Sequence, residues 1–192
     1  MCGLAGWFRL DIEPARRAPL LRDMCAVIAH RGPDDDGIYA DDHVGLGFRR
    51  LSIVDLESGR QPMATDDGQV VICFNGEIFN HVELRDDLIG KGWRFRTRSD
   101  TEVILRLYEA VGIEALSQLN GMFAVVIWDR RQGVLHLVRD RLGVKPLYYA
   151  RVGETLLFGS EIKAILASGR IGKSVNGQAI WDYLTLRYVP AP

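Results

Sequence analysis

A cysteine at the second position of the chain, followed by Gly3 and an apolar run, has the chemistry of a nucleophile. Methionine in front of so small a side chain is a good substrate for aminopeptidases, so we expect the mature chain to begin at Cys2. A free α-amine has a pKa of about 7.7 to 8.0 and a thiol one of about 8.5, so the amine can accept the thiol proton near neutral pH. Cys2 would then supply both nucleophile and base. On position alone, an ordinary small hydrophobic residue is the commoner role for such a cysteine.

A possible oxyanion site follows the apolar strand expected at residues 70–74. We expect the chain to leave that strand at Asn75 and Gly76 and to expose an amide side chain beside a bare backbone N–H. Two neutral donors of this kind suit a developing negative charge. An Asn-Gly hairpin turn is the usual alternative. It fits poorly here, because the apolar spacing after residue 82 predicts a helix that closes at Gly92.

Two charged positions could bind the ends of a zwitterion. Arg49 and Arg50 lie between apolar runs at residues 44–48 and 51–54, so we expect one of them to point inward and to need an anion such as a carboxylate. The alternative is an arginine at the surface. Asp100 falls in the first turn of the clearest helix, where it either complements the helix dipole or faces a pocket and holds an ammonium group.

The same helix has a predicted start, because Ser99 and Glu102 have the spacing of a capping box. Other charged residues are interpreted as scaffold. In RGPDDDG, an ion pair between Arg31 and Asp34 is favoured over direct substrate contact. A second charged scaffold is expected around the loop after residue 139, formed by Asp140, Arg141 and Lys145.

Composition limits the class of protein. The chain has 192 residues, a formal net charge of −1 and 47% apolar residues, which is typical of one soluble domain without a nucleic-acid or membrane partner. Its cysteines, Cys2, Cys25 and Cys73, are too few and too scattered for a disulfide framework or a zinc site, so a reducing cytoplasmic setting is expected. A basic leader and an apolar run of about 20 residues are both missing from the sequence.

The pattern of elements predicts an α+β fold of two stacked sheets covered by helices. Pro14 to Pro19 is interpreted as a break and RGPDDDG as an irregular turn. Strands are expected at residues 4–10, 44–48, 51–54, 70–74, 122–129, 134–139, 147–150 and 156–158. Helices are expected at about residues 20–30, 82–92, 99–111, 113–119, 160–167 and 178–186. The glycines form no phosphate cradle, since neither GxxxxGK[ST] nor SGGxDS occurs.

Motifs along nearly the whole chain then match one family in order and spacing. They are MCGLAGWF, RGPDDDG, RRLSIVD, FNGEIFN, RSDTEVI, LNGMFAVVIWD, RDRLGVKPLYY and FGSEIKAI. Together they resemble the glutaminase domain of the class II glutamine amidotransferases, most closely that of the glutamine-hydrolysing asparagine synthetases. The resemblance implies a four-layer αββα sandwich of the N-terminal-nucleophile hydrolase type over residues 1–186, with residues 187–192 as the start of a linker to an absent synthetase domain.

The resemblance also implies a reaction, in which Cys2 attacks the side-chain amide of L-glutamine, releases ammonia and leaves a thioester that is hydrolysed to glutamate. Arg50 would bind the α-carboxylate, Asn75 and Gly76 the oxyanion, and Asp100 the α-ammonium group. Glu77 would help to hold the amine. The backbone of Leu51, Ser52, Ile53 and Val54 would wall the pocket.

The implied partners are L-glutamine and a synthetase domain that uses the ammonia for ATP-dependent amidation of aspartate to asparagine. ATP and Mg²⁺ would belong to that absent domain, and the glutaminase domain would need no cofactor or metal. A homodimer is one candidate assembly. Phe48 and Phe79 stand where many relatives have histidine and tyrosine, and we expect the chemistry to be retained despite both changes.

Three alternatives remain open from the sequence. The fold could serve as a glutamine sensor or scaffold that keeps Met1 and has no activity. It could supply ammonia to a different acceptor, because glutaminase domains resemble one another more than their acceptor halves do. A thiol redox or metal protein is disfavoured, because no second cysteine lies near Cys2 in the sequence.

Overall fold

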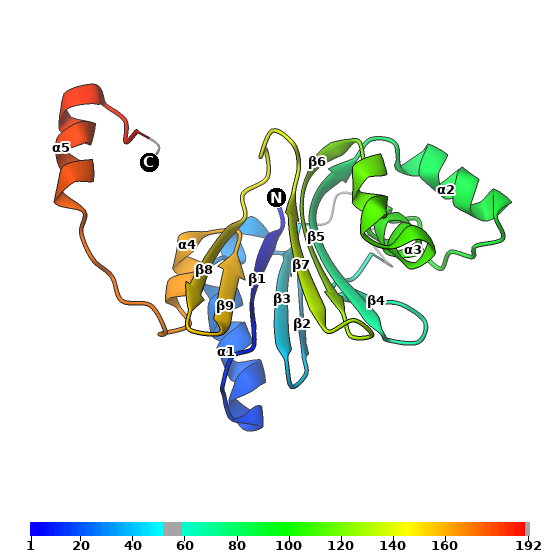
Figure 1. Cartoon of the computed structure of the whole chain (residues 1–192), viewed down its shortest axis with the longest axis horizontal. Helices are drawn as coiled ribbons and strands as arrows, with labels where there is room; N and C mark the ends of the chain where they lie inside the picture. The colour runs from blue at the N-terminus through cyan, green and yellow to red at the C-terminus, as the bar shows by residue number, and fades with distance from the viewer. Residues whose placement is uncertain (52–58, 191–192) are drawn as a thin grey trace.

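The computed structural model describes residues 1–51 and 59–190, and in this part of the chain two antiparallel sheets stack face to face (Figure 1). The first sheet has the strand order β2-β3-β1-β9-β8. Its strands are β1 (Gly3–Phe8), β2 (Asp35–Ala40), β3 (Val44–Arg50), β8 (Tyr148–Val152) and β9 (Thr155–Gly159). The second sheet has the order β4-β5-β6-β7. Its strands are β4 (Met63–Ala64), β5 (Val70–Ile78), β6 (Gly121–Asp129) and β7 (Val134–Arg139).

Helices cover the outer face of each sheet (Figure 1). The first sheet is covered by α1 (Pro14–Ala26) and α4 (Ile162–Leu166), and a short 3₁₀ turn, η1 (Ala29–Arg31), follows α1. The second is covered by α2 (His81–Gly90), α3 (Asp100–Val111) and the 3₁₀ segment η2 (Gly112–Gln118). The described residues therefore form the four layers αββα that we expected.

Each interface between layers has its own apolar core. Between the sheets, β5 contributes Val71 and Cys73, while the opposite face of β5 packs Ile72 and Phe74 against α3. This alternation explains why residues 70–74 read as a continuous apolar run, because both faces of the strand are covered. The third core packs α1 and α4 on the first sheet.

Two predictions about local structure are wrong. The segment from Pro14 to Pro19 is not a break, because α1 begins at Pro14 and continues through Pro19. Proline is favoured in the first turn, and burial of Leu21 and Met24 compensates for the donor that Pro19 removes. RGPDDDG is not wholly irregular either, since its last residues enter β2, which pairs with β3.

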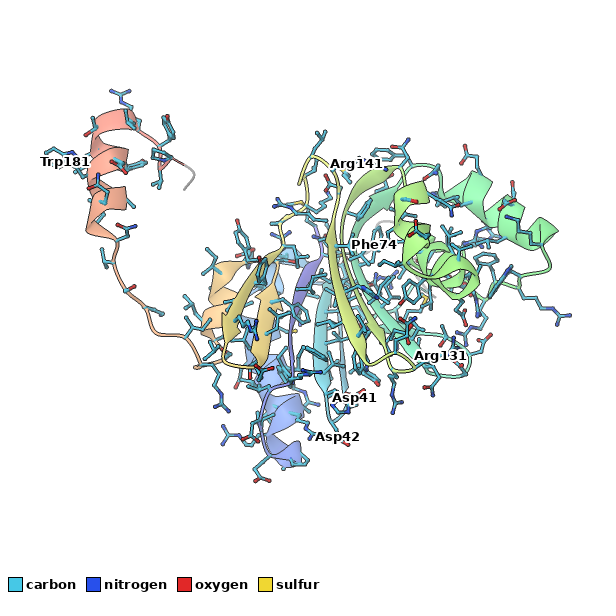
Figure 2. All side chains as sticks on the ribbon, viewed as in Figure 1. Asp41, Asp42, Phe74, Arg131, Arg141 and Trp181 are labelled. Atoms are coloured by element: carbon cyan, nitrogen blue, oxygen red, sulfur yellow. The ribbon has the colours of Figure 1, made fainter. Side chains whose placement is uncertain are left out.

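The last helix, α5 (Gly177–Leu186), stands apart from the sandwich, and none of its residues is buried (Figure 1). Figure 2 shows its Trp181 pointing away from the two sheets. The packed layers end with α4, and the domain boundary expected at Leu186 stays a prediction. None of the described helices combines the length and the apolar character that a membrane-spanning segment needs.

Candidate active site

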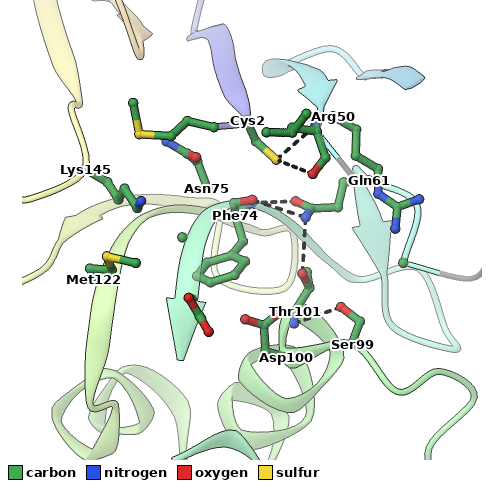
Figure 3. A pocket seen from close by; sticks show the side chains of 15 residues that line it. Cys2, Arg50, Gln61, Phe74, Asn75, Ser99, Asp100, Thr101, Met122 and Lys145 are labelled. Atoms are coloured by element: carbon green, nitrogen blue, oxygen red, sulfur yellow. Dashed lines mark hydrogen bonds between the residues drawn. The ribbon is translucent and has the colours of Figure 1, made fainter. Parts of the chain in front are cut away.

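A cavity of about 120 Å³ lies where the start of β1, the end of β3, the middle of β5 and the first turn of α3 converge (Figure 3). It brings together the candidate nucleophile, the candidate oxyanion donors and both candidate charged groups. The lining residues are Met1, Cys2, Arg50, Leu51, Gly59, Gln61, Phe74, Asn75, Gly76, Glu77, Ser99, Asp100, Thr101, Met122 and Lys145.

Cys2 is held just before β1, the middle strand of the first sheet. The backbone N–H of Leu51 donates to its Sγ across 3.4 Å, and Sγ is 3.6 Å from the Leu51 carbonyl oxygen. Burial raises the pKa of the Cys2 thiol. The Leu51 N–H and the positive charges of the amino terminus, Arg50 and Arg31 oppose that rise. The sulfur therefore stays a neutral thiol at neutral pH until a base accepts its proton.

Arg49 and Arg50 point to opposite faces of β3, as expected, because successive side chains of a strand alternate in direction. Arg50 is 6% exposed and lines the cavity. Arg49 turns the other way, donating from Nε to the Gly32 carbonyl oxygen across 3.1 Å and pairing with Asp36 at 3.4 Å. Arg50 is thus the guanidinium that faces the cavity.

Asn75 and Gly76 do not leave the strand, which corrects the expectation from the sequence. Both lie within β5, opposite Ala124 and Phe123 of β6. Asn75 is 1% exposed, and its Nδ2 has no hydrogen-bond partner among the described residues. A buried amide donor left unpaired costs about 1 to 3 kcal/mol, so the fold keeps a donor at this cavity that a ligand oxygen can satisfy.

Gly76 is required by the closeness of β6. A Cβ atom at this position would lie 2.3 Å from the Met122 carbonyl oxygen and 2.7 Å from the Phe123 Cα. These contacts are with backbone and cannot be relieved by a side-chain rotation. The glycine therefore allows β5 to pass close to β6 while its own backbone lines the cavity.

Asp100 is the first residue of α3 and is 7% exposed. Its Oδ2 accepts a hydrogen bond from the Ile78 N–H across 3.2 Å. Burial raises the pKa of the Asp100 carboxyl, and this bond and the nearby His81 only partly offset the rise. A carboxylate that is costly to bury and lines a cavity is suited to a cationic ligand group.

The helix start that positions Asp100 is only half of the predicted capping box. The Ser99 side chain accepts from the Thr101 N–H at 3.0 Å, as expected of an N-cap. Glu102 instead accepts from the backbone N–H groups of Arg96 and Thr97, at 2.9 and 2.6 Å. The Glu102 carboxylate therefore bonds to the loop before the helix, and not to the Ser99 N–H as a capping box requires.

The remaining predicted site residues have mixed outcomes. Glu77 is exposed and lies on the cavity lining, as does Leu51. Ser52, Ile53 and Val54 lie outside the described residues. Phe48 is fully buried between the sheets and Phe79 is 57% exposed, and neither lines the cavity.

Several residues at the site were missed or given another role. The expected partner of Arg31 was Asp34, but its Nε donates to the Cys2 carbonyl oxygen and its Nη1 pairs with Glu161. Lys145 lines the cavity, although we expected only a scaffold role. Asp140 does organise that loop, accepting from the N–H groups of Val144 and Lys145. Four further cavity residues had been assigned no role at a site: Gly59, Gln61, Thr101 and Met122.

Among the described residues, no three histidine, cysteine, aspartate or glutamate side chains cluster as metal ligands. What gathers at the cavity is a thiol, a guanidinium, a carboxylate and an unpaired amide donor. Such a set can bind a zwitterion and stabilise an acyl-transfer intermediate.

Comparison with known proteins agrees with this chemistry. Residues 1–192 match the model of a glutamine amidotransferase domain. The chain is 43% identical over 194 residues to asparagine synthetase [glutamine-hydrolyzing] 1 of Bacillus subtilis (strain 168), covering 100% of this chain and 30% of that protein. It is 39% identical over 185 residues to asparagine synthetase B [glutamine-hydrolyzing] of Escherichia coli (strain K12), covering 95% of this chain and 33% of that protein. The chain thus spans about a third of the length of these relatives.

The fold has solved counterparts. The glutamine phosphoribosylpyrophosphate amidotransferase of B. subtilis superimposes with a TM-score of 0.72 at 22% identity, covering 88% of this chain and 44% of that one. This likeness confirms the expected fold, a four-layer αββα sandwich. With the family model matched from end to end, the chain belongs to the glutamine amidotransferase domain family.

Proposed function

We propose that this domain hydrolyses the side-chain amide of L-glutamine through a thioester on Cys2. The observation that carries the proposal is one cavity lined by the Cys2 thiol, the Arg50 guanidinium, the Asp100 carboxylate and the unpaired amide of Asn75. A free amino acid needs one fixed cation and one fixed anion, placed so that its amide reaches the thiol.

Binding would use both charged groups. Arg50 donates from its planar fork to the α-carboxylate, and Asp100 accepts hydrogen bonds from the α-ammonium group. Glu77, at the cavity lining, would add negative charge near the amine. The backbone of Leu51 would form the wall beside the sulfur.

The chemistry follows from the groups around Cys2. Sulfur forms a bond to the amide carbon, and the oxygen gains negative charge that the Asn75 amide and the Gly76 N–H stabilise. The C–N bond then breaks, and the leaving nitrogen takes the proton that the thiol lost. Water next cleaves the γ-glutamyl thioester, which gives glutamate and restores the thiol, so that glutamine and water yield glutamate and ammonia.

The base in this scheme is the α-amine of Cys2, so the scheme requires removal of Met1. With Met1 attached, the Cys2 nitrogen belongs to a peptide bond and cannot accept a proton. Met1 lines the cavity. This position favours one second candidate, a sensor module that keeps Met1 and binds glutamine reversibly.

The destination of the ammonia is part of the proposal. The relatives named above are glutamine-hydrolysing asparagine synthetases, which supports amidation of aspartate by a synthetase domain that holds ATP and Mg²⁺. A different acceptor is the alternative.

The glutaminase step proposed for this domain uses no cofactor, because each charge in it is met by a side chain or a backbone N–H. Free Cys2, Cys25 and Cys73 support a cytoplasmic setting, and assembly as a homodimer is part of the same proposal.

Intact-mass spectrometry with a glutamine-like electrophile tests the proposal. We expect a species that lacks Met1, releases ammonia from glutamine and is labelled at Cys2. Retention of Met1 with reversible glutamine binding and no ammonia release would support the sensor. Labelling is followed by peptide mapping, and Cys2→Ala is the control that must lose both label and turnover.

A further inference from the structure

The side-chain amide of Gln61 makes the backbone hydrogen bonds that a neighbouring strand would make to β5. Its Oε1 accepts from the Phe74 N–H at 2.5 Å, and its Nε2 donates to the Phe74 carbonyl oxygen at 3.1 Å (Figure 3). Nε2 also donates to the Thr101 Oγ1 at 3.1 Å. Both N–H groups of the amide are therefore used within the protein.

Strand register explains why a side chain is needed here. In the ladder between β4 and β5, Met63 lies opposite Ile72 and Ala64 opposite Val71. Continuing that register places Gln61 opposite Phe74. β4 begins only at Met63, so the backbone ladder stops short of Phe74. The Gln61 amide supplies the two missing bonds of that ladder position.

The next residues along the same edge are the reactive part of the site. The N–H and C=O of Phe123 bond to Asp140, away from β5, so its partner Gly76 also faces away from β6. Phe74, Gly76 and Ile78 therefore present their N–H groups along the same edge of the strand. Gln61 holds Phe74 on one side of Gly76, and Asp100 holds Ile78 on the other.

We propose that Gln61 is a positioning residue for the oxyanion donors of Asn75 and Gly76. This inference rests on the proposed function of the cavity. Gln61 fixes the peptide immediately before Asn75, and through Thr101 it joins that peptide to the helix turn that carries Asp100. Oxyanion donors act only when they are held where the charge develops, so loosening this edge lowers kcat.

Kinetics of two variants test the role. For Gln61→Met, we expect kcat for glutamine hydrolysis to fall about tenfold or more while KM changes by less than about twofold. For Gln61→Glu, the ionised carboxylate repels the Phe74 carbonyl oxygen, whereas the protonated acid can donate to it. The ratio of the Gln61→Glu kcat to the wild-type kcat should therefore rise as pH is lowered from about 8 to about 5.5. The exposed Gln132, changed to Met, is the matched control and should match wild type in both constants.

Hydrogen exchange measures the same edge without relying on activity. We expect the Phe74 and Gly76 amide protons to exchange at least about tenfold faster in Gln61→Met than in wild type, with exchange in the β6–β7 ladder unchanged. Unchanged exchange at Phe74 would overturn the inference, as would a Gln61→Glu ratio that does not vary with pH. A wild-type protein that fails to hydrolyse glutamine would sink the proposed function, while the exchange data still decide whether Gln61 holds the strand.

Discussion

Arg31 donates from Nε to the carbonyl oxygen of Cys2 across 2.9 Å, which fixes the backbone that carries the candidate nucleophile. The guanidinium is itself held by Glu161, whose Oε1 lies 3.2 Å from Nη1. Burial would raise the pKa of Glu161, but Lys163, His30 and Arg31 outweigh it and lower the pKa to about 2. Glu161 therefore stays ionised at neutral pH and keeps Arg31 in place.

Glu161→Gln should lower kcat for glutamine hydrolysis by about threefold to tenfold with little change in KM, because Arg31 loses its anionic partner but remains present. Steady-state glutamate release measures both constants. Lys163→Ala is the control: Lys163 also contacts Glu161, at 3.1 Å, but its side chain is 48% exposed. Equal losses in the two variants would contradict a role for the link between Arg31 and Cys2.

The cysteines should differ sharply in reactivity. Burial raises the pKa of Cys25 to about 12 and that of Cys73 well above its ordinary value, and neither lines the cavity. A glutamine-like electrophile should therefore label Cys2 and leave the other two cysteines unmodified, as peptide mass mapping can show.

Cys2→Ala should abolish ammonia release and retain glutamine binding, as calorimetry can measure. Ammonia release by Cys2→Ala at the wild-type rate would remove the mechanism.

Arg50→Ala should raise KM for glutamine about tenfold to a hundredfold, because a charge-assisted pair of about 1.5 to 3 kcal/mol with the α-carboxylate is lost. Arg49→Ala is the matched variant, since its guanidinium points to Gly32 and Asp36 on the opposite face. It should leave KM within about twofold of wild type. The reverse result would show that Arg49 binds the carboxylate.

The sequence predicted the layers because apolar spacing records which faces are buried. The stripe of α3 and the apolar runs of β5 and β6 correspond to cores of the folded protein. Proline and glycine were weaker guides. The start of α1 at Pro14 and the passage of β5 through Asn75 and Gly76 depend on tertiary packing, which local turn preferences do not contain.

At the site, too, the sequence identified some residues and missed others. Cys2, Arg50 and Asp100 were named from their residue types and from the family motifs that contain them, and the cavity brings them together. Gln61 and Arg31 were assigned no site role, because their partners Phe74 and Glu161 lie 13 and 130 residues away in the sequence. A side chain that bonds to distant backbone leaves no spacing rule in a single sequence.

Gly76→Ala should lower both stability and activity. The added methyl group would meet the backbone of Met122 and Phe123, so β5 and β6 must separate at a cost of about 1 to 3 kcal/mol. Urea denaturation and kcat measure the two effects. Gly68→Ala has free space around the new methyl group, so it reports the cost of its positive φ without a clash. A Gly76→Ala protein as stable and active as wild type would show that the close approach of β6 is not needed.

Asp100→Asn should separate stability from function. The folded pKa of Asp100 lies above its unfolded value, so its ionisation destabilises the fold above that folded pKa and ceases to do so as pH falls below the unfolded value. At pH about 7, Asp100→Asn should keep or raise the melting temperature while KM for glutamine rises at least about tenfold. In wild type, KM should rise as pH falls through the raised pKa of Asp100. Glu102→Gln, two residues further along α3, should instead lower the melting temperature, because Glu102 accepts from the backbone N–H groups of Arg96 and Thr97 and pairs with Arg106. A large loss of stability in Asp100→Asn would mean that this carboxylate serves the helix start more than the ligand.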